Sequence, residues 1–328
     1  MSRADCIDHS KRGDKSGYQI KRFNRLKYAH QQVLELYVLQ GLSYKQIAQQ
    51  LQLPYDTVFG IVQRLSANYP AEVIRAQKRL PTIFVVGDTQ CKQGVDLEYM
   101  KWIGYYIARK KPDIIVHIGD NWDLAALSSY DKGQLSAEGK RLHLDIKAGT
   151  DGMDLIDAEI AKVQGYHPRK VITFGNHEHR ADRFVQENPE LEGLIGTEVL
   201  AETIPTWEVH PFLKPVRIHG INFIHFVPNP MSGKPYGGTV QNILKNTGAS
   251  FVMGHKQILD IALRPTLDGT HQIGVIVGAS YAHDEAYKGY TGNNHFRGCV
   301  MLTEVQDGHA LPSPVSLDYM RKVYQDNH

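Results

Sequence analysis

The chain has 328 residues, of which 42% are hydrophobic and 22% are charged, and its net charge is +2. This length allows one large domain or two ordinary ones, and the composition is typical of a folded globular protein. No apolar run reaches the roughly 20 residues of a membrane-spanning helix, and three scattered cysteines exclude a disulfide framework.

Charge is distributed unevenly along the chain. The first 80 residues hold 13 basic and 6 acidic residues, whereas the remainder holds 24 basic and 29 acidic ones. This asymmetry predicts a basic module for an anionic partner and an acidic body that can hold cations. Charge begins at Arg3, so we expect no secretory signal, no membrane partner and a cytoplasmic location. The oligomeric state is left open.

Residues 1–28 are polar and basic and are interpreted as a flexible arm. Residues 29–78 are expected to form a small all-α domain. Apolar residues recur there at helical spacing, Gly41 ends the first helix, and Ser43 caps the second. Pro54 breaks the second helix before a third begins.

The stretch 41–58 resembles a helix-turn-helix DNA-binding unit. The resemblance implies that the third helix enters the major groove. The residues expected to contact DNA are Tyr55, Thr57, Gln63 and Arg64. Gln52 departs from the pattern, because the turn often has glycine there. The alternative is a three-helix packing unit that contacts only protein.

From residue 79 to residue 328 the pattern alternates between strands and helices. The expected strands are 82–86, 114–118, 171–174, 223–226, 251–253, 275–277 and 300–302, and the expected helices are 97–111, 151–164 and 242–245. This order predicts an α/β sandwich covered by helices. Residues 124–150, which carry several basic side chains, are expected to form a helical insertion over the cleft.

Polar clusters follow the first three strands, each directly after a glycine. They are Gly87-Asp88-Thr89-Gln90, Gly119-Asp120-Asn121-Trp122-Asp123 and Gly175-Asn176-His177-Glu178, and two later strands end in His225 and in Gly254-His255-Lys256-Gln257. Side chains at the carboxyl ends of strands in open α/β folds face a shared crevice. The sequence therefore predicts one site that these clusters build together.

The order of these motifs resembles the calcineurin-like metallophosphoesterase superfamily over residues 82 to about 305. Its pattern is Asp-x-His, Gly-Asp-x-x-Asp, Gly-Asn-His-Glu/Asp, a lone His and Gly-His-x-His. The resemblance implies a metallophosphoesterase β-sandwich flanked by helices, with two divalent metal ions. Such a pair of cations clamps a phosphoryl group and activates an attacking water.

The resemblance also implies a role for each matching residue. Asp120 would bridge both ions, Asp88 would bind the first, and the second would be completed by Asn176, His225 and His255. His177 would act as a general acid beside the scissile phosphate, and Asp123 would orient it. For the lone histidine, His219 and His210 are competing candidates, and His225 is favoured because it follows a strand.

Two departures from the family pattern fall on the first ion. Gln90 and Gln257 stand where the family has histidine. With Asp88 and Asp120 they would form an all-oxygen site, which suits Mn²⁺ or Mg²⁺ better than Zn²⁺. We therefore expect a weakly held first ion, with Mn²⁺ as the leading candidate, and a tighter second one. The rival interpretation is a single-metal or inactive enzyme.

Residues 278–297 resemble a stretch that is common in phage-encoded members of the superfamily, which would place the protein in the host cytoplasm. The resemblance suggests a substrate loop in which Lys288 or Arg297 lies near phosphate and Tyr281 or Tyr287 stacks on a base. A loop that packs against the sheet edge is the alternative. His179 and Arg180 were expected either to face substrate or to cap the next helix.

Three functions remain open from the sequence. The leading one is a DNA phosphodiesterase or nuclease that the helix-turn-helix module targets to its substrate, because tethering raises the local substrate concentration. The second is a phosphomonoesterase that acts on a phosphoprotein or a nucleotide. The third is a DNA-binding protein that has lost turnover through the two glutamines.

Overall fold

The computed structural model describes residues 26–69, 71, 80–129, 133, 135, 138–285 and 288–328. The chain divides into two compact units, residues 1–79 and residues 80–328, and each is described by itself. The basic arm predicted for residues 1–28 lies almost wholly outside the described residues. Within the described part of the chain, no helix is long and apolar enough to cross a membrane.

The first unit is helical, as the sequence predicted. Its elements are α2 (Tyr28–Leu34), the π-helical segment η2 (Glu35–Leu39), α3 (Tyr44–Leu51), α4 (Tyr55–Leu65) and the 3₁₀ turn η3 (Ser66–Asn68). Val33, Ile47, Val58 and Ile61 are buried together and form the centre of its core. The Ser43 side chain accepts a hydrogen bond from the Gln46 amide, which confirms the predicted cap of α3.

Gln52 takes the backbone conformation that glycine usually provides in such a turn. It follows α3 with a φ of 52°, in the left-handed region. A side chain costs about 1 kcal/mol or more there, whereas glycine has no Cβ to clash. We expect Gln52→Gly to stabilise the first unit by about 0.5–1 kcal/mol, measured by urea denaturation of the full chain.

Gln49 provides the matched control for this substitution, because it is an exposed glutamine inside α3. Gln49→Gly should lower the free energy of unfolding by about 1 kcal/mol, since glycine is a poor helix former. If Gln52→Gly lowered the free energy of unfolding as Gln49→Gly does, the left-handed backbone at Gln52 would not be a source of strain.

The second unit contains two β-sheets. The first has the order β11-β10-β1-β2-β3-β4, with β1 (Ile83–Val86), β2 (Ile114–His117), β3 (Arg169–Thr173), β4 (Glu208–His210), β10 (Gly298–Gln306) and β11 (His309–Ser316). The second has the order β5-β6-β7-β9-β8, with β5 (Val216–Ile218), β6 (Ile221–Phe223), β7 (Phe251–Met253), β8 (Leu259–Pro265) and β9 (His271–Val277). β1, β2, β3 and β4 run parallel, and so do β6, β7 and β9.

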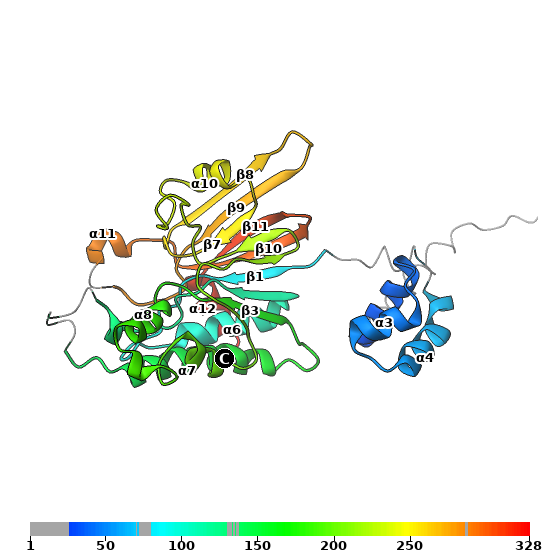
Figure 1. The fold of residues 1–328 in the computed structure, drawn as a ribbon, viewed down its shortest axis with the longest axis horizontal. Helices are drawn as coiled ribbons and strands as arrows, with labels where there is room; N and C mark the ends of the chain where they lie inside the picture. Colours follow the sequence, from blue (N-terminus) through cyan, green and yellow to red (C-terminus); the bar gives the residue numbers. More distant parts are fainter. Residues whose placement is uncertain are drawn as a thin grey trace, which may run out of the picture. The chain divides into compact units, whose positions relative to one another are not determined.

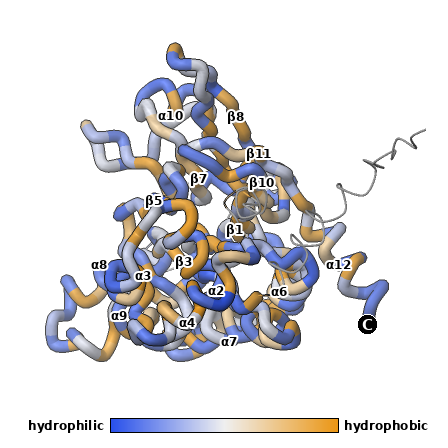
Figure 2. Tube along the Cα trace, turned by 90° about the vertical axis from the view of Figure 1, so that its right-hand side faces the viewer, coloured by the Kyte–Doolittle hydropathy of each residue, from blue (hydrophilic) through white to orange (hydrophobic). Residues whose placement is uncertain are grey.

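Helices cover the outer face of each sheet. The helices described in this unit are α6 (Glu98–Lys110), α7 (Leu142–Ala161), α8 (His179–Glu187), α9 (Thr197–Glu202), α10 (Val240–Thr247), α11 (Gly289–Asn293) and α12 (Leu317–Gln325), together with the 3₁₀ turns η4 (Ala125–Leu127) and η6 (Pro189–Leu191). Figure 1 shows α6, α7 and α12 below the first sheet and α10 beside β8 and β9, which it contacts. In Figure 2, α12 alternates between hydrophobic and hydrophilic segments, as an amphipathic helix does.

One hydrophobic core lies between the two sheets. Val85 of β1, Val116 of β2, Phe223 of β6, Val252 of β7 and Val275 of β9 are all fully buried in one hydrophobic cluster. Two further clusters join the outer face of each sheet to its helices. The second unit is therefore an α/β sandwich of two packed sheets flanked by helices, and the predicted fold class is confirmed.

The prediction that residues 124–150 form a helical insertion over the cleft is partly wrong. α7 begins at Leu142 rather than at residue 151, and it packs against α6 as part of the core. Gly149 and Gly152 obscured this helix in the sequence. A side chain at Gly149 would collide with the Trp122 ring, and one at Gly152 would lie 2.7 Å from the Cys91 sulfur. Both glycines permit close packing rather than ending the helix.

Candidate metal centre

The polar clusters at the strand ends come together at one edge of the sandwich. Asp88 and Gln90 follow β1, Asp120 follows β2, Asn176 and His177 follow β3, His225 follows β6, and His255 and Gln257 follow β7. Several hydrogen bonds between described residues join the sheets there, and two of them involve the predicted histidines. The His255 amide donates to Asp88 Oδ1 at 3.1 Å, and the His225 ring nitrogen Nδ1 donates to the Ile118 carbonyl at 2.9 Å.

Asp120 lies at the centre of this group. Its Oδ1 accepts the His177 amide at 2.9 Å, and its Oδ2 lies 3.3 Å from His225 Nε2. Burial raises the pKa of Asp120, but His177 and His225 outweigh it and hold the pKa well below its ordinary value. The carboxylate is thus charged and buried, which suits a group that faces a cation.

His225 and His255 offer ring nitrogens beside this carboxylate. Ligand atoms of Asp120, His225 and His255 all lie within 4.8 Å of one another, so the three residues could hold a metal ion. Asn176 Oδ1 lies 2.9 Å from His225 Nε2 and 2.8 Å from His255 Nδ1. Burial, together with the charge of His225, lowers the pKa of His255 to about 4, so its imidazole is neutral and can act as a ligand.

Asp88 and Gln90 carry buried polar atoms that suit a second cation. Asp88 Oδ2 and both side-chain amide atoms of Gln90 are buried and find no hydrogen-bond partner among the described residues. An unpaired buried polar group is costly, and a bound ion is one way to satisfy it. Burial raises the pKa of Asp88 to about 6, and the nearby Asp120 carboxylate adds to the rise. A cation there would hold Asp88 in its charged form.

Gln257 is placed differently from Gln90. Its Oε1 accepts a hydrogen bond from the Tyr281 hydroxyl at 2.9 Å, and Lys288 Nζ donates to that hydroxyl at 2.6 Å. The Lys288 ammonium group has only donors, so the Tyr281 hydroxyl points its proton at Gln257. The side-chain NH₂ group of Gln257 is left for Asp88, and this hydrogen bond lowers the pKa of Asp88. The oxygen predicted to be a ligand is therefore already shared with Tyr281.

Four residues of this centre have left-handed backbone conformations. The φ angles are 42° for Gln90, 52° for Asp120, 64° for His255 and 55° for Gln257. Such conformations cost of order 1–3 kcal/mol for non-glycine residues and cluster at functional sites. Glycine is also required between the strands and the site, because a side chain at Gly175 would collide with Asp120 and His225.

His177 lies beside the ligand group and is held by a carboxylate. Its Nδ1 lies 2.7 Å from Asp123 Oδ1, and its Nε2 lies 3.7 Å from Asp120 Oδ2 and 3.2 Å from an Arg180 guanidinium nitrogen. Burial lowers the pKa of His177, but Asp120 and Asp123 outweigh it and raise the pKa above its ordinary value. Lys92 Nζ lies 3.6 Å from Asp123 and fixes that carboxylate from the other side.

Glu178 has a structural role that the sequence analysis did not assign. Its buried carboxylate accepts backbone amides of Gly175, Asp120, Asn121 and Trp122 at 2.6–3.0 Å. These bonds tie the loop after β3 to the loop after β2. Glu178 thereby fixes the distance between Asn176 and Asp120. Its position next to His177 in the third motif was the only signal for it in the sequence.

An open cleft of about 530 Å³ gives access to the candidate metal centre. It is lined by Asp120, Asn176, His177, His255, Lys256, Gln257, Ile258, Lys288, Gly292 and His295. Lys256 and Lys288 bring positive charge to this cleft, which is suitable for a phosphate group. Burial lowers the pKa of each lysine from its ordinary value.

The other predicted substrate residues lie in varied settings. Arg297 donates to the Ala282 carbonyl and the Asp284 carboxylate, so it anchors its own loop rather than lining the cleft. Tyr281 is fully buried, and the prediction that it stacks on a base is wrong. Tyr287 lies outside the described residues. His179 is the first residue of α8, and its Nδ1 lies 3.1 Å from the Asp182 carboxylate. Its ring stacks on that of Phe212, with the ring centroids 5.0 Å apart.

The residues predicted to contact DNA belong to the first unit. Tyr55, Thr57, Gln63 and Arg64 are all exposed on α4. Tyr55 stacks on Phe59 with ring centroids 6.5 Å apart, and Arg64 donates to the Gly60 carbonyl. Their exposure leaves them available to a partner, and contact with DNA stays a prediction.

Comparisons with known proteins find only distant likenesses. No protein-family model and no curated protein matches the chain. Yfce, a phosphoesterase from E. coli, is 10% identical with a TM-score of 0.34, over 72% of this chain and 99% of that one. A dimetal phosphatase from Danio rerio is also 10% identical with a TM-score of 0.34, over 73% and 97%. At these scores the likenesses carry no conclusion about activity.

Proposed function

We propose that the chain is a metal-dependent phosphoesterase that cleaves phosphodiesters, with DNA as its substrate. The observation that carries the proposal is the grouping of Asp120, His225 and His255 together with buried, unpaired side-chain atoms of Asp88 and Gln90. Such a donor set suits divalent cations, which Asp88, Gln90, Asp120, His225 and His255 would hold. When bound, divalent cations neutralise phosphoryl oxygens and activate a water for in-line attack.

The residues of the chain itself supply binding and proton transfer. His177 lines the cleft and would donate a proton to the leaving-group oxygen, while Asp123 holds the opposite ring nitrogen in place. Lys256 and Lys288 would pair with the phosphate that enters the cleft. Since no atom of His177 is needed as a ligand in this arrangement, its catalytic role can be separated from metal binding.

Two model substrates test the proposal. With Mn²⁺ present, bis-p-nitrophenyl phosphate should be hydrolysed faster than p-nitrophenyl phosphate. Faster hydrolysis of the monoester would favour a phosphatase that acts on phosphoprotein or nucleotide. No hydrolysis of either ester would favour a non-catalytic DNA-binding protein. Gln90 and Gln257, which stand where the family has histidine, would then explain the loss of turnover.

We expect the two ions to differ in affinity. Two imidazoles and an amide serve the second ion, whereas the first would rely on oxygen donors, which bind most divalent metals less tightly. After dialysis against metal-free buffer, elemental analysis should find one ion per chain, the second, and added Mn²⁺ should restore the first. Two equally tight zinc ions would contradict this expectation.

Gln90→His adds an imidazole to the weaker position and should increase retention of the first ion. Histidine tolerates the left-handed backbone at this position better than most residues. Gln93→His is the matched control, because Gln93 is exposed three residues further along the same loop. Equal metal retention in both variants would show that Gln90 does not face the ion.

The proposed substrate rests on the first unit. If α4 acts as a recognition helix, its exposed residues deliver duplex DNA to the second unit. Deleting residues 1–75 should weaken duplex binding by at least tenfold, because the basic segment that pairs with phosphates is removed. Hydrolysis of bis-p-nitrophenyl phosphate should persist, since the second unit is compact by itself. Unchanged affinity for the duplex would remove the targeting role.

A further inference from the structure

A second pocket of about 450 Å³ opens between η4 and α8. Its described lining comprises Ala125, Ala126, Leu127, Ser128, Ser129, Gly133, Lys140, Arg180, Arg183, Phe184 and Glu187. This volume falls within the range of roughly 300–1,000 Å³ that is usual for small-molecule sites. None of the roles assigned above uses the pocket.

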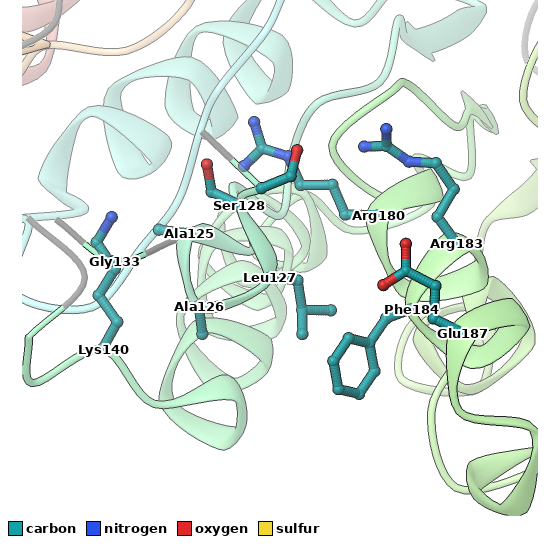
Figure 3. A pocket seen from close by; sticks show the side chains of 11 residues that line it. Ala125, Ala126, Leu127, Ser128, Gly133, Lys140, Arg180, Arg183, Phe184 and Glu187 are labelled. Carbon is teal, nitrogen blue, oxygen red and sulfur yellow. The ribbon is translucent and has the colours of Figure 1, made fainter. Parts of the chain in front are cut away.

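The pocket has one apolar side and one cationic side. Figure 3 shows Leu127 from η4 and Phe184 from α8 approaching each other, with the guanidinium groups of Arg180 and Arg183 beyond them. Lys140 adds a third cation, whereas Glu187 is the one carboxylate among the lining residues that the structure describes. An aromatic face beside guanidinium groups suits a ligand that joins a flat ring to an anion.

Arg180 connects this pocket to the candidate metal centre. It lines the pocket, while one guanidinium nitrogen lies 3.2 Å from His177 Nε2 and another donates to the Asp123 carbonyl at 2.7 Å. His177 in turn lines the cleft that contains Asp120. The pocket therefore lies on the side of the site from which His177 would protonate the leaving group.

We propose that this pocket is a nucleotide subsite for the leaving-group side of the substrate, an inference that rests on the proposed function. A phosphate of the leaving nucleotide pairs with Arg180 and Arg183, and its base lies against Phe184. Arg180 is held in place by its hydrogen bond to the Asp123 carbonyl, so it is preorganised for the anion. Arg183 is exposed, and no ion pair ties it to any described residue.

Binding of a mononucleotide tests the subsite without turnover. Thymidine 5′-monophosphate is titrated by calorimetry into the full chain in EDTA, with inorganic phosphate as a second probe. Arg183→Gln should raise the Kd for the nucleotide at least tenfold, and Phe184→Leu should raise it while leaving the Kd for phosphate unchanged. Arg217→Gln is the matched control, because Arg217 is an exposed arginine on β5.

Two results would overturn the subsite. One is a Kd for Arg183→Gln within twofold of that for Arg217→Gln. The other is equal affinity of the unmodified chain for phosphate and for the nucleotide, which would remove the base contact. Hydrolysis of bis-p-nitrophenyl phosphate separates this proposal from the proposed function. A chain that binds the nucleotide through Arg183 but hydrolyses no ester keeps the subsite and loses the function.

Discussion

Replacing His177 by alanine is expected to lower kcat for bis-p-nitrophenyl phosphate by a factor of about 10²–10⁴, the usual contribution of a positioned general acid. The bound metal should remain, because the His177 ring is not part of the Asp120, His225 and His255 group. The His177 backbone amide, which donates to Asp120, is retained in the alanine variant. Elemental analysis and steady-state kinetics on the same sample measure both quantities.

Two further variants bracket this result. Asp123→Asn removes the charge that holds His177 Nδ1 and should cost about 10–100-fold in kcat, as loss of an orienting partner typically does. His167→Ala changes an exposed histidine and should leave kcat unaltered. A His177→Ala enzyme that loses its metal, or that keeps kcat within a few fold of the original, would rule out the separate role of His177 as acid.

The position of the site could be predicted from the sequence because it depends on local order. Each buried strand is short and apolar, and a glycine and a polar residue follow it directly, as in Gly119-Asp120. β1, β2 and β3 run parallel, so their carboxyl ends lie at the same edge of the first sheet, independently of the segments that connect them. His225 follows β6 of the second sheet, so this reasoning does not place it beside Asp120; its assignment came from the resemblance to the superfamily pattern and from the strand that precedes it.

Contacts that depend on side-chain packing could not be predicted in this way. The bond between Tyr281 and Gln257 requires the loop after β9 to lie against the loop after β7, and no periodicity encodes that contact. The link from Arg180 to His177 depends on the first turn of α8. β11 was not predicted because Pro312 and Pro314 interrupt its pattern, which an edge strand tolerates.

Asp120→Asn should abolish the candidate metal centre with little change to the backbone. Asparagine tolerates the left-handed φ of 52° and can still accept the His177 amide, so the loop is preserved. The lost charge removes the group predicted to lie between both ions. We expect metal content to fall below one ion per chain, and kcat to fall by on the order of 10³, because bound cations contribute several kcal/mol.

Asp151→Asn is the matched control, since Asp151 forms an exposed ion pair with Lys147 on α7. Its metal content and kcat should equal those of the unmodified chain, as surface pairs contribute little. Circular dichroism on both variants separates loss of metal from loss of fold. Full retention of two ions in Asp120→Asn would mean that the ions lie elsewhere, because a buried carboxylate this close to two imidazoles would otherwise dominate their binding.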